Sequence, residues 1–70
     1  MTLSSRERLA KRIRALRLQK GWSQEYLADE SGLHRTYIGT VERSEQSMTV
    51  DTIDKLAKAL EVKVSELFSD

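Results

Sequence analysis

Polar and cationic side chains gather near the middle of the chain, next to short apolar patterns. His34, Arg35 and Thr36 come just before one apolar pattern, and Thr40 follows one helical turn later. An arginine can donate two hydrogen bonds to guanine O6 and N7, and a threonine can meet a thymine methyl group or a base acceptor. The chemistry that these residue types support is the reading of base edges by the first turn of a helix.

A second set of polar residues lies just before the apolar residues Leu27 and Ala28. Ser23 can cap a helix there, and Gln24 falls in its first turn. The Gln24 amide and the free backbone N–H groups of a helix start can bind a phosphate together.

Groups suited to catalysis or metal binding are scarce. The chain has one histidine and no cysteine, and its carboxylates have no zinc or calcium spacing. Gly21, Gly32 and Gly39 form no phosphate-cradling loop. His34 alone is more often a cap or a surface residue than a ligand. We therefore expect no enzyme, no metal, no cofactor and no small-molecule ligand.

Apolar residues at three- and four-residue spacing predict the elements that position these groups. The first helix begins at Ser4, which has the spacing of a capping box with Glu7, and Gly21 ends it. Ser23 begins a second helix, which Gly32 ends. After a three-residue turn, a third helix runs from about His34 to Arg43. The apolar stripes are Leu9, Ile13 and Leu16 in the first helix, Leu27 and Ala28 in the second, and Tyr37, Ile38 and Val41 in the third.

Thr49 and Asp51 mark the start of a fourth helix. Its stripe is Ile53, Leu56, Ala57 and Leu60, and the apolar tail after it is Val62, Val64, Leu67 and Phe68. Ser65 and Glu66 fit the start of one last helical turn, with a strand as the alternative over so few residues. Residues 1–70 are therefore expected to form one all-α domain of five helices.

Charge is divided unevenly along the 70 residues, although the net charge is only +1. Residues 1–20 hold seven Lys or Arg against one acid, whereas the remainder is mildly acidic. A basic first helix can attract DNA or can simply be a solvated face. No apolar run of about 18 residues is present, and charged residues stand where a signal peptide would be apolar. A soluble, cytoplasmic protein is expected.

The segment SQEYLADESGLHRTYIGTVER, residues 23–43, has the arrangement of a helix-turn-helix. The chain over residues 7–68 resembles the DNA-binding domain of the phage-repressor-like (XRE/Cro) family, through Gln24, Leu27-Ala28, Ser31-Gly32-Leu33, Ile38 and Val41-Glu42-Arg43. The resemblance implies a lambda-repressor-like fold with the helix-turn-helix at helices 2 and 3. It also implies an ion pair between Arg17 and Glu42 that links the first helix to the end of the third.

Within that family, the string HRTYIGTVER, the length and the short tail are most similar to restriction-modification controller proteins. This resemblance implies a dimeric regulator that binds palindromic operators and activates and represses its own gene and the endonuclease gene. A phage-type repressor, an antitoxin-like regulator and a protein-interaction module with the same fold remain alternatives.

The expected DNA contacts fall into two groups. Base contacts are expected from Arg35, Thr36, Tyr37 and Thr40, although Tyr37 can equally pack at the edge of the core. Backbone contacts are expected from Ser23, Gln24, His34, Arg43, Ser44, Gln46 and Ser47.

Apolar residues near the end of the chain are candidates for a dimer interface. They are Leu60, Val62, Val64, Leu67 and Phe68, with the outer face of the fourth helix. Leu67 and Phe68 can alternatively cap the monomer core. Glu61 and Lys63 stand where relatives often have a helix-ending glycine and a capping serine. Acidic residues of the second helix, Glu25, Asp29 and Glu30, are candidates for contact with RNA polymerase.

Overall fold

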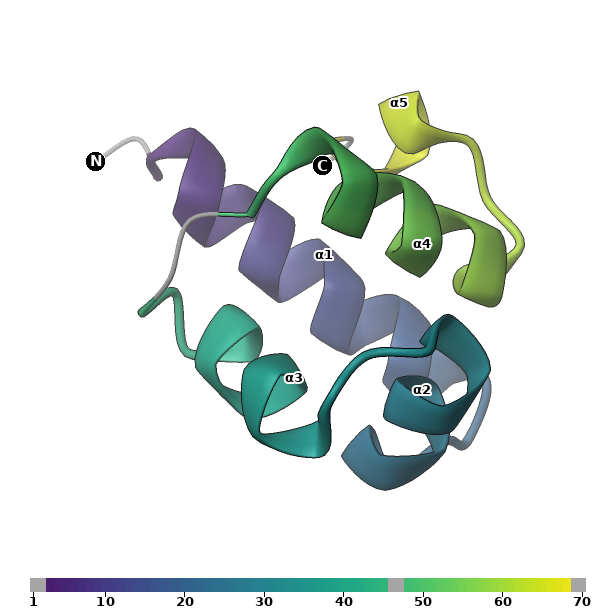
Figure 1. Cartoon of the computed structure of the whole chain (residues 1–70). Helices are drawn as coiled ribbons and strands as arrows, with labels where there is room; N and C mark the ends of the chain where they lie inside the picture. Colours follow the sequence, from purple (N-terminus) through teal and green to yellow (C-terminus); the bar gives the residue numbers. More distant parts are fainter. Residues whose placement is uncertain (1–2, 46–47, 69–70) are drawn as a thin grey trace.

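Five helices make up the described part of the chain, which is residues 3–45 and 48–68 of a computed structural model (Figure 1). They are α1 (Ser5–Gln19), α2 (Gln24–Ser31), α3 (Arg35–Glu42), α4 (Val50–Leu60) and α5 (Val64–Leu67). Those residues contain no strand, so the expected all-α class is confirmed, and the last apolar stretch is a helical turn.

The helices begin at side chains that satisfy free backbone N–H groups. The Ser4 Oγ accepts from the Glu7 N–H at 3.1 Å, and the Glu7 carboxylate accepts from the Ser4 N–H at the same distance. The backbone hydrogen bond from Ser4 lowers the pKa of Glu7. The hydroxyls of Ser23 and Thr49 cap α2 and α4 in the same way, at 3.0 and 3.2 Å. The predicted helix starts are therefore fixed by local hydrogen bonds.

Left-handed residues follow four of the five helices, and two of these residues are not glycine. Gly21 and Gly32 both have φ +74°, as expected, but Ser44 and Glu61 also have φ +60° and +61°. A side chain makes this conformation unfavourable. After α4 the Glu61 N–H donates to the Lys58 carbonyl at 3.1 Å, and the Glu61 carboxylate accepts from Lys20 Nζ at 2.9 Å. This hydrogen bond to Lys20 lowers the pKa of Glu61. The helix therefore ends at Glu61 without a glycine.

One apolar core lies between the helices. The largest side chains buried in it are Ile13, Leu27, Ile38, Val41, Leu56, Leu60 and Leu67. Helix α3 packs against α1 and α2, and α4 packs against the same two helices. The short α5 packs against α4 and α1, on the far side of α4 from α3 (Figure 1). The exposed surface of α5 therefore lies apart from α3 (Figure 1).

Two residues expected at the dimer interface belong to the monomer core instead. Leu60 and Leu67 are 1% and 0% exposed, because α5 folds back over α4 and turns Leu67 inward. The Arg12 Nε also donates to the Glu66 carbonyl at 3.0 Å, which ties α5 to α1. These two leucines offer no surface to a partner, so we remove them from the candidate interface.

Arg17 and Glu42 form a buried bidentate ion pair between α1 and α3. Arg17 Nε and Nη2 donate to the two carboxylate oxygens of Glu42 at 2.7 and 2.9 Å, and the side chains are only 8% and 3% exposed. Arg17 Nη1 donates to the Trp22 carbonyl at 2.8 Å, in the turn between α1 and α2. The hydrogen bond to Glu42 raises the pKa of Arg17. The pair therefore holds α3 and the start of α2 to α1.

Arg17→Ala is expected to lower the free energy of unfolding by about 3–5 kcal/mol, because it leaves the Glu42 carboxylate buried without a partner. Urea denaturation followed by circular dichroism measures the change. Lys20→Ala is the control, since it removes a positive charge at the C-terminal end of α1 and breaks only surface contacts, namely the ion pair with Glu61 and a cation–π contact with the Trp22 ring. An Arg17→Ala variant that unfolds at the same urea concentration as the parent would contradict the assigned role.

Candidate nucleic-acid interface

The first turn of α3 presents its side chains to solvent. His34 caps the helix, and its Nδ1 accepts from the Thr36 N–H at 3.1 Å. Arg35 and Thr36 are exposed immediately after this cap. The capped turn fixes the backbone from which these side chains project, so the arginine and the threonine can meet base edges in a groove.

Tyr37 and Thr40 are less exposed than Arg35 and Thr36. Tyr37 is partly buried and packs against the core. This agrees with packing at the edge of the core, which was the expected alternative to a base contact. The Thr40 Oγ1 donates to the Tyr37 carbonyl at 2.8 Å, within α3 itself. Arg35 and Thr36 are therefore the most accessible of the four residues proposed to read bases.

The start of α2 lies close to the end of α3. The Ser23 Oγ accepts from the Tyr26 N–H at 3.0 Å, while the partly buried Gln24 turns its amide nitrogen to Glu42 Oε1 at 3.2 Å. Gln24 thus joins the ion pair of Arg17 and Glu42. The structure brings these residues of α1, α2 and α3 into one hydrogen-bonded group.

The loop after α3 is held by short-range contacts. Arg43 Nε donates to the Glu45 carboxylate at 3.0 Å, and both side chains are more than half exposed. Ser44 has a left-handed backbone, which turns the chain away from α3. Gln46 and Ser47, two further expected backbone contacts, lie outside the described residues. Because an arginine has five N–H donors, the bond from Nε to Glu45 does not by itself prevent Arg43 from binding a phosphate.

Sequence reasoning missed one contact or role of each of three residues in this region. Glu42 was expected as the partner of Arg17 but not as an acceptor for Gln24. Glu45 was not identified as a partner of Arg43, although a spacing of two residues was a signal for it. Gly39 lets Arg43 fold back over α3, because a Cβ there would stand 3.1 Å from Arg43 Nη1.

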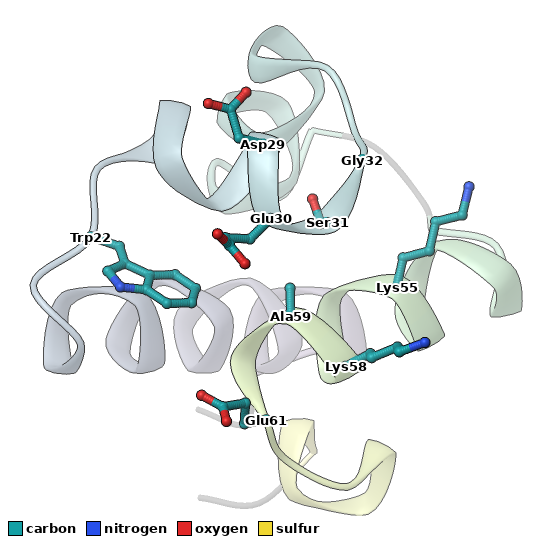
Figure 2. A pocket seen from close by; sticks show the side chains of 9 residues that line it. All are labelled: Trp22, Asp29, Glu30, Ser31, Gly32, Lys55, Lys58, Ala59 and Glu61. Carbon is teal, nitrogen blue, oxygen red and sulfur yellow. The ribbon is translucent and has the colours of Figure 1, made fainter.

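The acidic residues of α2 border a groove of about 710 Å³ between α2 and α4 (Figure 2). Glu30 lies between the two helices, whereas Asp29 points away from α4, and Lys55 and Lys58 come from the opposite wall. Glu25 is exposed near the start of α2. The groove thus mixes charges of both signs, and only part of the acidic surface points freely outward.

Over residues 3–45 and 48–68, no set of histidine, cysteine or carboxylate side chains is grouped as a metal site would require. Within the same part of the chain, no helix has the length and apolar character needed to cross a membrane.

The remaining candidates for a dimer interface form a small apolar surface. Val64 and Phe68 are each 39% exposed, and Val62 is partly buried. The outer face of α4 adds little apolar area, because apart from Val50 its exposed residues are charged: Asp51, Asp54, Lys55 and Lys58. A candidate interface therefore centres on α5.

Comparisons with known proteins agree with this geometry. A helix-turn-helix family model, HTH_3, matches residues 13–67. Control protein C.SmaI of Serratia marcescens is 50% identical over 64 residues, which cover 91% of this chain and 76% of that protein. Control protein C.BamHI of Bacillus amyloliquefaciens is 43% identical over 68 residues, which cover 96% of this chain and 84% of that protein.

Two solved structures have the same fold. The restriction-modification controller protein C.AhdI from Aeromonas hydrophila aligns with a TM-score of 0.85 at 46% identity, over 87% of this chain and 92% of that chain. The biofilm regulator SinR, crystallised in complex with DNA, aligns with a TM-score of 0.82 at 29% identity, over 87% of this chain and 98% of that chain. With the family model matching most of its length, this chain belongs to the helix-turn-helix family of DNA-binding transcriptional regulators.

Proposed function

We propose that this chain is the controller protein of a restriction-modification system. It binds palindromic operators as a dimer and activates and represses its own gene and the endonuclease gene. The observation that carries the proposal is an exposed Arg35 and Thr36 on a capped α3 that is anchored to α1, in a chain similar to two control proteins along most of its length. Its place of action is the cytoplasm, where bacterial DNA lies.

Specificity comes from α3 lying in the major groove. Arg35 donates two hydrogen bonds to a guanine, and Thr36 contacts a neighbouring base. Gln24 and Arg43 bind phosphates on either side and set the depth and angle of α3. Tyr37 and Thr40, which lie further inside, make secondary contacts with bases, while Ser23, His34 and Ser44 face the DNA backbone.

A dimer is needed because one short helix reads few bases and neutralises few phosphates. We propose that Val64 and Phe68 of α5, with Val62, pack against the same residues of a second copy around a two-fold axis. Since α5 lies on the far side of α4 from α3, such a contact leaves both reading helices open (Figure 1).

Activation requires a contact with the transcription machinery. We propose that the acidic surface of α2, formed by Glu25, Asp29 and Glu30, contacts RNA polymerase when a dimer occupies the upstream operator. Glu25, Asp29 and Glu30 are all exposed residues, and a basic surface on the polymerase would complement the part of this acidic surface that points out of the groove. A second dimer at the adjacent operator blocks the promoter.

Arg35→Ala is expected to remove about 1–3 kcal/mol of discrimination at one guanine of each half-site. Fluorescence anisotropy with the operator that the parent selects, and with the same duplex changed at that base pair, measures it. Lys58→Ala is the charge-matched control, because Lys58 lies on α4 beside the groove and away from α3. Equal discrimination by Arg35→Ala and the parent would refute base reading by Arg35.

Val64→Asp is expected to convert the dimer to a monomer, because it places a charge in an apolar contact. Sedimentation at micromolar concentration measures the mass, for which the monomer is 8.0 kDa. Leu18→Asp is the control, since Leu18 is an exposed apolar residue of α1. The interface assignment fails if Val64→Asp sediments as a dimer. The dimer itself is excluded if the parent is monomeric both with and without operator DNA.

Replacing Glu25, Asp29 and Glu30 together by alanine is expected to abolish activation while leaving operator affinity unchanged or slightly higher. Transcription from a promoter with the upstream operator, alongside anisotropy on the same DNA, separates the two effects. Asp51→Ala with Asp54→Ala on α4 controls for loss of negative charge elsewhere. Activation that survives the triple substitution would discard the polymerase contact.

A further inference from the structure

We propose that the Arg17–Glu42 pair is also a positioning device for the DNA backbone contact: Glu42 orients the Gln24 carboxamide toward a phosphate, and Arg17 cancels the charge that would repel it. The proposal rests on the proposed function, since it concerns how Gln24 meets DNA. It assigns to the pair a role in binding that is separate from its role in stability.

The orientation of the Gln24 amide follows from the chemistry of its neighbour. An ionised carboxylate only accepts hydrogen bonds, so the amide nitrogen rather than the oxygen must face Glu42. Nε2 lies 3.2 Å from Glu42 Oε1, while Oε1 of the amide lies 3.8 Å from the place where a Cβ of Gly39 would stand. The amide oxygen is thus directed to α3 and the nitrogen to the ion pair.

The hydrogen bond to Glu42 uses one of the two N–H groups of the amide nitrogen. The other N–H is fixed with it, because the carboxamide is planar. A glutamine held in this way donates to a phosphate without losing the rotamer freedom that an exposed glutamine would lose. If the amide were reversed, its oxygen would face the phosphate. Both groups are hydrogen-bond acceptors, so no hydrogen bond could form between them.

Charge balance makes the arrangement compatible with DNA. A carboxylate within 3.2 Å of a phosphate-binding amide would repel the phosphate if it were alone. Arg17 donates to both oxygens of Glu42 and so places a positive charge next to the negative one. Arg17 Nη1 also donates to the Trp22 carbonyl, two residues before Gln24. One guanidinium therefore sets the charge and the backbone position of this site.

The test is a double-mutant cycle on operator affinity. The pair is replaced by Arg17→Met with Glu42→Leu, since apolar residues of similar size often preserve a fold that contained a buried ion pair. Gln24→Ala is then made in the parent and in this background. We expect roughly tenfold weaker binding in the parent, the size of one hydrogen bond to a charged group, and less than about twofold in the pair variant.

Arg35→Ala is the matched control for the cycle, and its loss of affinity should be the same in both backgrounds if α3 keeps its position. An equal loss from Gln24→Ala in both backgrounds would overturn the proposal. A parent protein that binds no duplex would instead overturn the proposed function.

A second measurement needs neither the pair variant nor DNA. In the free parent protein, the side-chain amide hydrogens of Gln24 should exchange with water more slowly than those of Gln19, which is exposed on α1. Equal exchange rates, measured by nuclear magnetic resonance, would show that Glu42 does not hold the amide and would overturn the proposal even if the pair variant failed to fold.

Discussion

The buried pair of Arg17 and Glu42 connects α1, α2 and α3. It crosses from α1 to the last residue of α3, and it also reaches the α1–α2 turn through the Trp22 carbonyl. A 70-residue chain has a small core, and α2 and α3 have only eight residues each. Helices of that length are marginal on their own. Apolar packing holds the helices together, while the ion pair fixes the end of α3 against α1.

The fold could be predicted because its determinants are local. Ser4, Ser23 and Thr49 cap helices by bonds that span three residues, and Gly21 and Gly32 end them. The apolar stripes then identify the core face of each helix. The end of α4 was less evident, because Glu61 takes a left-handed conformation and pairs with Lys20, which is 41 residues away.

The surface could be predicted only in part. The first turn of α3 follows from its cap, so exposure of Arg35 and Thr36 could be anticipated. The side of α5 that faces the core could not, because a single turn has no periodicity, and Leu67 is buried only through the way α5 folds over α4. The bond between Gln24 and Glu42 likewise depends on the approach of α2 to α3, which spacing alone does not define.

If this chain reads a palindrome as a dimer, selection of bound sequences from a randomised duplex library will reveal it. We expect enrichment of a palindrome whose half-sites lie about one DNA turn, roughly 34 Å, apart, and the affinity for the selected duplex should fall steeply as the salt concentration is raised. No enrichment at any salt concentration would contradict it and would mean that the helix-turn-helix binds a protein partner instead.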